Sequence, residues 1–177
     1  ATRLITLTAG GNDIAYIGDL TAMAYQRQGG IPGFLVGQFW KGAKPVDNRD
    51  FATLRSDLVS TLRKIRVRAP KAQIIVVTYP AILPETGTCS QLGIDAAQAD
   101  MMRPVALRLA NVTRSAAKEA GATVVDMATL SKDHDACTTQ PWANGSAPTQ
   151  GVAFHPTLAG TKATAAQIMT KLKEDIR

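Results

Sequence analysis

Cysteine and histidine are scarce in this sequence, which contains two residues of each. A structural zinc site needs several such ligands at paired spacings, and the isolated Cys89 and Cys137 match no such pattern. The sequence therefore excludes a zinc module of that kind. The two cysteines are either free thiols or one disulfide. A bridge would stabilise the fold by about 4 kcal/mol in the chain-entropy model.

Long apolar runs and blocks of one charge are also absent. No apolar run approaches the ~18 residues of a membrane-spanning helix, so we expect no membrane span. The net charge is +6, but lysine and arginine are scattered along the whole chain. The densest basic stretch, residues 63–68, ends a predicted helix, where cations suit the helix dipole. We therefore expect no nucleic-acid partner, which would need a clustered basic stripe.

Glycine and proline are too few, at 14 and 9 residues, for a collagen-like or low-complexity chain. Hydrophobic residues make up 45% of the sequence, which is too many for a disordered chain. A length of 177 residues is enough to bury a substantial core. The chain opens at Ala1 without a signal-peptide pattern, as a mature exported protein or an excised fragment would. We expect residues 1–177 to form a single domain.

Apolar periodicity predicts three strands that alternate with three helices. The strands are expected at residues 4–8, 74–78 and 123–125. The helices are expected from 51 to 65, from about 101 to 116 with Pro104 in its first turns, and from about Thr157 to Ile176. The glycine-containing stretch from Leu20 to Asn48 is expected to form a long loop that borders a site.

This alternation predicts an α/β sandwich with a parallel sheet, in which ligands bind at the carboxyl ends of the strands. Polar residues follow each predicted strand. They are Gly10-Gly11-Asn12-Asp13 after the first, Tyr79 after the second, and the stretch from Asp126 to His155 after the third.

Two of these segments could carry chemistry. The two glycines allow a sharp turn close to a ligand, and Asn12 could donate a hydrogen bond to an oxyanion. Taken in isolation, the residues favour an ordinary turn with Asp13 as a helix cap. His155, placed by Pro156 just before a helix, is a candidate general base or a plain surface histidine. His134 is the only other histidine.

The segment Leu7-Thr8-Ala9-Gly10-Gly11-Asn12-Asp13 resembles the Gly-x-Asn-Asp block of the SGNH, or GDSL-type, hydrolases. The segment Phe154-His155-Pro156-Thr157-x-x-Gly160 resembles the block that carries their catalytic histidine. Residues 132–137 and 141–145 resemble the stretch before that histidine in secreted actinobacterial lipases and esterases of the family. The resemblance covers nearly the whole chain.

The resemblance implies a three-layer α/β/α sandwich, a flavodoxin-like arrangement, and hydrolysis of carboxylic esters. Asn12 and Gly10 would form the oxyanion hole, His155 would be the general base, and Gly11 and Asp13 would contact substrate. It also implies an ester or lipid substrate, no metal or organic cofactor, a secreted or cell-envelope location, and a disulfide between the two cysteines.

The family's Gly-Asp-Ser block and its first two strands are absent from the sequence. None of the six serines follows a strand in a Gly-Asp-Ser context, and Gly18-Asp19-Leu20-Thr21 is only a superficial echo. We therefore interpret the chain as the C-terminal part of a hydrolase whose serine lies on an absent N-terminal segment, on the same or a separate chain. The alternatives are an inactive pseudoenzyme or carbohydrate-binding remnant, and an unrelated flavodoxin-like domain that binds a small ligand.

Two further expectations concern the surroundings of the site. Val152 stands where many members have an aspartate three residues before the histidine, which implies that a backbone carbonyl orients the ring. Asp126, Asp133 and Asp135 are expected to be structural. The apolar residues between 21 and 47 would form a wall for an acyl chain or a structural flap: Met23, Tyr25, Ile31, Phe34, Leu35, Phe39 and Trp40.

Overall fold

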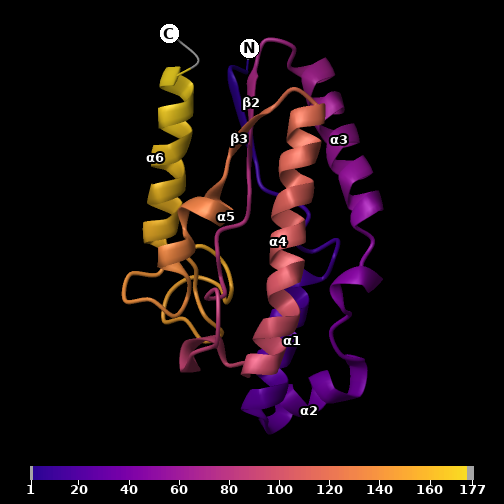
Figure 1. Ribbon diagram of the computed structural model, residues 1–177, viewed down its shortest axis with the longest axis vertical. Coiled ribbons are helices and arrows are strands. Elements are labelled where there is room, and N and C mark those ends of the chain that lie inside the picture. Colours follow the sequence, from indigo (N-terminus) through magenta and orange to yellow (C-terminus); the bar gives the residue numbers. More distant parts are fainter. Residues whose placement is uncertain (1, 175–177) are drawn as a thin grey trace.

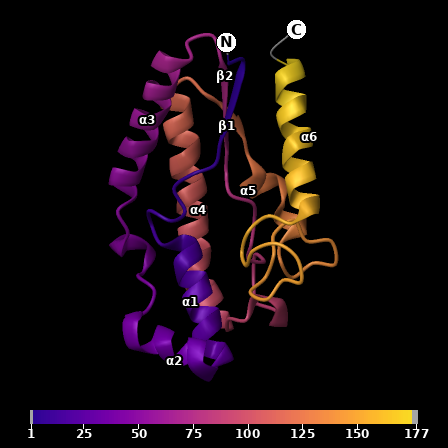
Figure 2. The same ribbon diagram turned by 180° about the vertical axis from the view of Figure 1, so that it is seen from behind.

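A parallel β-sheet lies between two layers of helices in the computed structural model, which describes residues 2–174 (Figures 1 and 2). The strands are β1 (Leu4–Leu7), β2 (Gln73–Val77) and β3 (Thr123–Val125), and they pair in that order. Both pairings are parallel. The predicted strands and the predicted α/β sandwich are confirmed.

The central strand β2 is buried on both faces, because helices cover it from each side. Ile74 and Val76 pack in one cluster with Leu62 of α3 (Phe51–Arg68) and Ala117 of α4 (Ala96–Glu119). The alternate residues Ile75 and Val77 pack in another cluster, against side chains of α6 (Leu158–Glu174). Figure 1 shows α3 and α4 on one side of the sheet and α6 on the other. The order of layers is therefore helix, sheet, helix.

Strand β1 is covered on one face only. Its register pairs Ile5 with Ile74, so Ile5 shares the face covered by α3 and α4. Leu4 and Thr6 lie on the α6 face, where both are exposed. Among the described strands β1 pairs only with β2, so its outer edge is open. An open edge is a template for a further strand.

The helix α4 begins earlier than the apolar pattern indicated. The Asp95 carboxylate accepts a hydrogen bond from the Gln98 N–H, and the Gln98 side chain accepts one from the Asp95 N–H. This capping box starts the helix at Ala96. Pro104 consequently lies inside α4 rather than in its first turns, and the prediction of its place was wrong.

The predicted loop from Leu20 to Asn48 is wrong for most of its length. Helix α1 covers Tyr16–Gln28 and helix α2 covers Gly30–Phe39. Gly29, at a φ of 74°, makes the sharp break between them. Gly33, one of the glycines that suggested a loop, serves helix packing instead, because a Cβ there would lie 2.7 Å from the carbonyl oxygen of Tyr25 in α1.

The remaining elements are short and lie within the predicted loops. They are α5 (Met127–Leu130) and three 3-10 turns at Val46–Asn48, Ser90–Leu92 and Lys132–His134. Ile176, which the sequence pattern includes in the last helix, lies outside the described residues. None of the described helices is both long and apolar enough to cross a lipid bilayer.

The loops that follow the strands gather at one end of the molecule. In Figure 1 the start of β1 and the end of α6 lie at the top, and the strands run downward toward α1, α2 and the loop before α6. The carboxyl end of the sheet is therefore where the candidate residues are found.

Candidate active site

The turn after β1 needs glycine at two successive positions for reasons of space. Gly10 has a φ of 104°, and a Cβ there would lie 2.9 Å from the Leu54 side chain. A Cβ at Gly11 would lie 2.8 Å from the phenol of Tyr79. An added side chain at either position would force the Leu54 or Tyr79 side chain to shift, so glycine suits the segment where it passes α3 and the end of β2.

Asn12 and Asp13 follow the two glycines in this turn, and both residues are exposed. The Asn12 carbonyl accepts from the Ala15 N–H at 3.0 Å, which closes the turn. Helix α1 then starts after Ala15, which has a φ of 56° and no side-chain cap. The interpretation of Asp13 as a helix cap is therefore wrong, and its carboxylate lies at the carboxyl end of the sheet together with the Asn12 amide.

Tyr79, which follows β2, contacts the turn at Gly11, a role that the sequence did not predict. Its hydroxyl accepts a hydrogen bond from the Gly11 N–H at 3.3 Å. Burial raises the pKa of the Tyr79 phenol, the Gly11 N–H opposes that rise, and the negative charge of Asp13 adds to it. Its position directly after a strand was the available signal, because that is where site residues of parallel sheets lie.

A buried ion pair anchors the other side of the turn. The Arg49 guanidinium lies 2.6 Å from the Asp19 carboxylate and also donates to the carbonyl oxygens of Ile14 and Lys44. The second oxygen of Asp19 accepts from the Trp40 indole at 3.0 Å. Gly18-Asp19, which superficially resembles the start of a Gly-Asp-Ser block, is therefore a structural part of α1.

His155 is exposed on the loop before α6, and its ring is held by a backbone carbonyl. The Nδ1 atom lies 2.8 Å from the Ala153 carbonyl oxygen. Because a carbonyl can only accept, Nδ1 carries the proton in the neutral ring, and Nε2 keeps its lone pair for a base. The carbonyl is that of Ala153, while the Val152 carbonyl accepts from the His155 N–H and the Asn144 amide.

The residue before the histidine fixes the loop to the core. Phe154 is only 2% exposed and adopts a φ of 58°. The Asn144 N–H donates to the His155 carbonyl at 2.8 Å, so the backbone of the histidine is also held. An exposed ring on a fixed backbone has a reproducible position, which a general base needs.

The residues after the histidine fix the start of α6. The Thr157 hydroxyl accepts from the Gly160 N–H at 3.0 Å and donates to the Pro141 carbonyl at 2.8 Å. A Cβ at Gly160 would lie 2.0 Å from the Trp142 carbonyl oxygen. The spacing Thr157-x-x-Gly160 therefore combines a helix cap with a close approach of helix and loop.

His134, Asp126 and Asp135 have structural contacts. The His134 ring stacks on Trp142 with 4.0 Å between centroids, and its Nδ1 lies 2.9 Å from the Gln140 carbonyl oxygen. Asp126 accepts from Thr78, Arg114 and Thr129. Asp135 accepts from the Cys137 N–H, and Asp133 is exposed. His155 is thus the histidine whose exposed ring is not used in packing.

The two candidate segments meet through the core below them. Phe154 belongs to the same buried cluster as Ile14, Tyr16 and Ile17, which follow the Asn12 turn. The side chains of Asn12 and His155 make no hydrogen bond with each other in the described part of the chain. The fold therefore brings both segments to the carboxyl end of the sheet without a hydrogen bond between the two side chains.

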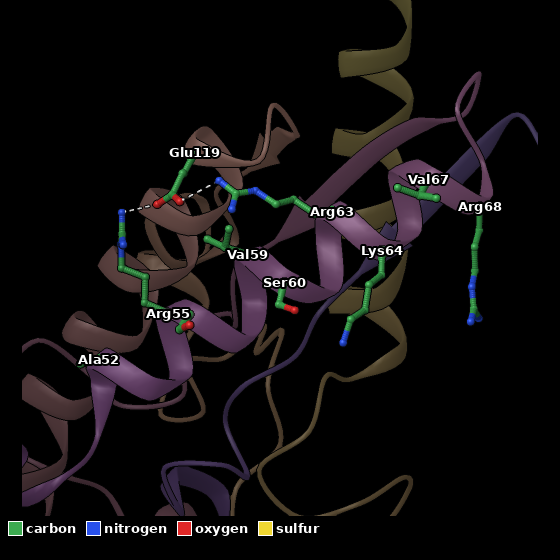
Figure 3. A pocket seen from close by; sticks show the side chains of 10 residues that line it. Ala52, Arg55, Val59, Ser60, Arg63, Lys64, Val67, Arg68 and Glu119 are labelled. Carbon is green, nitrogen blue, oxygen red and sulfur yellow. Dashed lines mark hydrogen bonds and ion pairs between the residues drawn. The ribbon is translucent and has the colours of Figure 1, made fainter.

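None of the serines stands beside either histidine as a hydrogen-bonded nucleophile in the described residues. Ser60 lies in a hollow of about 520 Å³ on the outer surface of α3, among Arg63 and Lys64 (Figure 3). Ser131 is buried and donates to the Met127 carbonyl, and Ser146 donates to the Gln91 carbonyl. Figure 3 also shows Arg55 and Arg63 holding Glu119, so this hollow is part of a surface ion-pair network.

A disulfide joins Cys89 and Cys137, as the family resemblance implied. The bond ties the loop after β2 to the loop that precedes His155, with 5.7 Å between the Cα atoms. No group of His, Cys, Asp and Glu side chains suited to a metal ion occurs among the described residues.

The fold and this site define a class: an α/β/α hydrolase-like sandwich with an exposed histidine before its last helix. Residues 1–163 match the model of the GDSL-like Lipase/Acylhydrolase family, and the chain belongs to that family. Lipase 2 of Streptomyces coelicolor is 34% identical over 145 residues, covering 77% of this chain and 47% of that protein. The chain thus spans about half the length of this relative.

Two solved structures share the fold. Phospholipase A1 from Streptomyces albidoflavus NA297 matches 96% of this chain and 69% of its own, with 24% identity and a TM-score of 0.72. The extracellular lipase from Streptomyces rimosus matches 97% of this chain and 69% of its own, with 23% identity and a TM-score of 0.70.

Proposed function

We propose that the complete protein hydrolyses carboxylic esters, with His155 as general base. The observation that carries this proposal is the contact between His155 Nδ1 and the Ala153 carbonyl, which leaves Nε2 as an exposed proton acceptor. The Asn12 amide and the backbone N–H of Gly10 are the proposed donors to the oxyanion. Gly11 and Asp13 are proposed to contact substrate beside them.

The reaction needs a serine hydroxyl within reach of Nε2. His155 takes the hydroxyl proton as the serine oxygen attacks the ester carbonyl, and it returns that proton to the leaving alcohol. Asn12 stabilises the tetrahedral oxyanion, and one such donor contributes about 3–4 kcal/mol to transition-state binding. A water molecule, activated by the same imidazole, then releases the acid and restores the serine.

We infer that this serine lies on polypeptide that precedes β1 in the complete protein. The open edge of β1 and its uncovered Leu4 and Thr6 support this inference, since further strands and a helix would cover both. The length of Lipase 2, about twice the matched part, is consistent with it. The disulfide between Cys89 and Cys137 supports secretion of this protein, because such bonds persist in the oxidising environment outside the cell.

The test is ester turnover by native-length protein, whose intact mass is measured first. His155→Ala should lower kcat for a p-nitrophenyl ester at least a hundredfold, because it removes the base. His134→Ala is the matched control and should retain most of the activity, since His134 packs on Trp142. Equal loss in both variants, or none with His155→Ala, would overturn the role of His155. A native protein without ester turnover would favour a ligand-binding remnant.

A further inference from the structure

The surface of α2 carries an unusual set of exposed apolar side chains. Helix α2, with the sequence GIPGFLVGQF, contains no charged residue. Its large side chains are strongly exposed, at 78% for Ile31, 66% for Phe34, 50% for Leu35 and 82% for Phe39. Tyr25 of α1 is also exposed. These five residues are called the α2 patch below.

The α2 patch is one face of a helix rather than a scatter of residues. Ile31, Leu35 and Phe39 follow one another at a spacing of four, and Phe34 lies beside them. Gly33, on the opposite side of α2, is buried against α1. The helix therefore turns its small residue inward and its large apolar residues outward, the reverse of an ordinary surface helix.

The helix is fixed in this orientation at both ends. The contact of Gly33 with the Tyr25 carbonyl holds its first turn on α1. The Trp40 indole, directly after the helix, donates to the buried Asp19 carboxylate. These two contacts orient α2 so that its large apolar side chains face outward.

The charged residues of the segment that carries the α2 patch have one sign. No acidic residue occurs between Asp19 and Asp47, while this stretch contains Arg27, Lys41 and Lys44. All three cations are exposed, and only Arg27 has an acidic partner in the described part, Asp95 at 3.6 Å. An apolar helix flanked by cations is complementary to a surface of apolar chains and anionic headgroups.

We propose that the α2 patch docks the protein onto an anionic lipid surface. Figures 1 and 2 show α2 at the tip of the molecule, at the end where the loops after the strands lie and opposite the start of β1 and the end of α6. Docking there brings the carboxyl end of the sheet toward the lipid. The proposal concerns binding alone and does not depend on hydrolysis by His155.

The test is co-sedimentation with sucrose-loaded vesicles of phosphatidylcholine, with and without phosphatidylglycerol. The chain and the native-length protein should both bind, more strongly to the anionic vesicles and less at high salt. The double change Phe34→Ser and Phe39→Ser should lower partitioning at least tenfold, because two exposed aromatic side chains no longer enter the lipid. Lys41→Gln with Lys44→Gln should remove most of the preference for phosphatidylglycerol.

Matched controls keep the result specific. Val67→Ser on α3 changes a side chain that is 81% exposed, flanked by arginines and remote from α2, and it should leave partitioning unchanged. His155→Ala should also bind vesicles normally, which separates this proposal from the proposed catalysis. Folding of each variant is checked by its urea midpoint, and Phe39→Ser alone serves if the double variant is unstable.

Three outcomes would overturn the proposal. The first is vesicle binding that the serine changes in α2 do not alter. The second is a protein that binds no vesicles but forms a dimer in analytical ultracentrifugation, and whose dimer dissociates when the serine changes are made. This result would assign the α2 patch to contact with a second copy of the chain. The third is a native-length protein that binds no vesicles, which would mean that other polypeptide covers the α2 patch.

Discussion

The guanidinium of Arg49 lies 2.6 Å from the carboxylate of Asp19, and the two side chains are only 2% and 8% exposed. This pair joins α1 to the loop before α3. Through the carbonyl of Ile14, Arg49 also holds the turn that presents Asn12. Charged groups so deeply buried are costly unless every partner is in place. The position of the Asn12 turn therefore depends on residues remote from it in sequence.

Replacing Arg49 by methionine should destabilise the fold by about 3–5 kcal/mol, because Asp19 would be left as a buried, unpaired charge. The free energy of unfolding in urea measures this loss. Arg27→Met is the matched control, since its pair with Asp95 is exposed and 3.6 Å long. That change should cost less than about 1 kcal/mol. Similar losses in both variants would contradict the structural role assigned to Arg49.

Gly11→Ala should destabilise the protein by about 1–3 kcal/mol, because the new methyl group would overlap the Tyr79 phenol at 2.8 Å. Gly18→Ala is the opposite case, since a Cβ there meets nothing within 4 Å and the site is in α1. It should stabilise by about 0.5–1 kcal/mol through helix propensity. Thermal or urea unfolding of the two variants distinguishes a crowded turn from a tolerant one. If Gly11→Ala were as stable as the wild type, Gly11 would not be crowded by the Tyr79 phenol.

Removing the disulfide by Cys89→Ala with Cys137→Ala should cost about 4 kcal/mol, given a sequence separation of 48 residues. The physical reason is that the unfolded chain regains the freedom that the cross-link removed. Urea unfolding with and without a reductant provides the measurement, and reductant should no longer affect the double variant. A wild-type protein equally stable in reductant would show that the bond contributes little.

Alkaline pH should weaken the fold. Burial raises the pKa of both Tyr16 and Tyr79 above the ordinary value of 10.0. Below about pH 10 both states keep the phenolic protons, so the full stability is present. Above it the unfolded chain releases protons that the folded chain retains, and the free energy of unfolding falls by up to about 1.4 kcal/mol per pH unit for each phenol.

Urea unfolding over this alkaline range checks the slope, with Tyr79→Phe as the informative variant. Its slope should be shallower than that of the wild type, because one of the two retained protons is gone. An unchanged slope would mean that the Tyr79 phenol titrates alike in the folded and unfolded chain.

Some elements could be predicted because their signals are local. The apolar run of β2 indicated a strand buried on both faces, and the period of Leu54, Leu58 and Leu62 indicated the buried face of α3. Other signals were misleading. Glycines between Leu20 and Asn48 indicated a loop, because local propensity does not reveal that Gly33 packs against a backbone carbonyl. The start of α4 was missed because its capping box lies before the first apolar residue of the pattern.

The sequence by itself determined the three strands and the three long helices α3, α4 and α6 that cover them, and it placed Asn12 and His155 after strands of one parallel sheet, because side-chain periodicity and turn chemistry act over short distances. Only the tertiary structure decided that the Ala153 carbonyl orients His155, that Tyr79 supports the Asn12 turn and that α2 turns its apolar face outward. Those outcomes depend on contacts between segments far apart in the chain, and such contacts form only when the layers have packed.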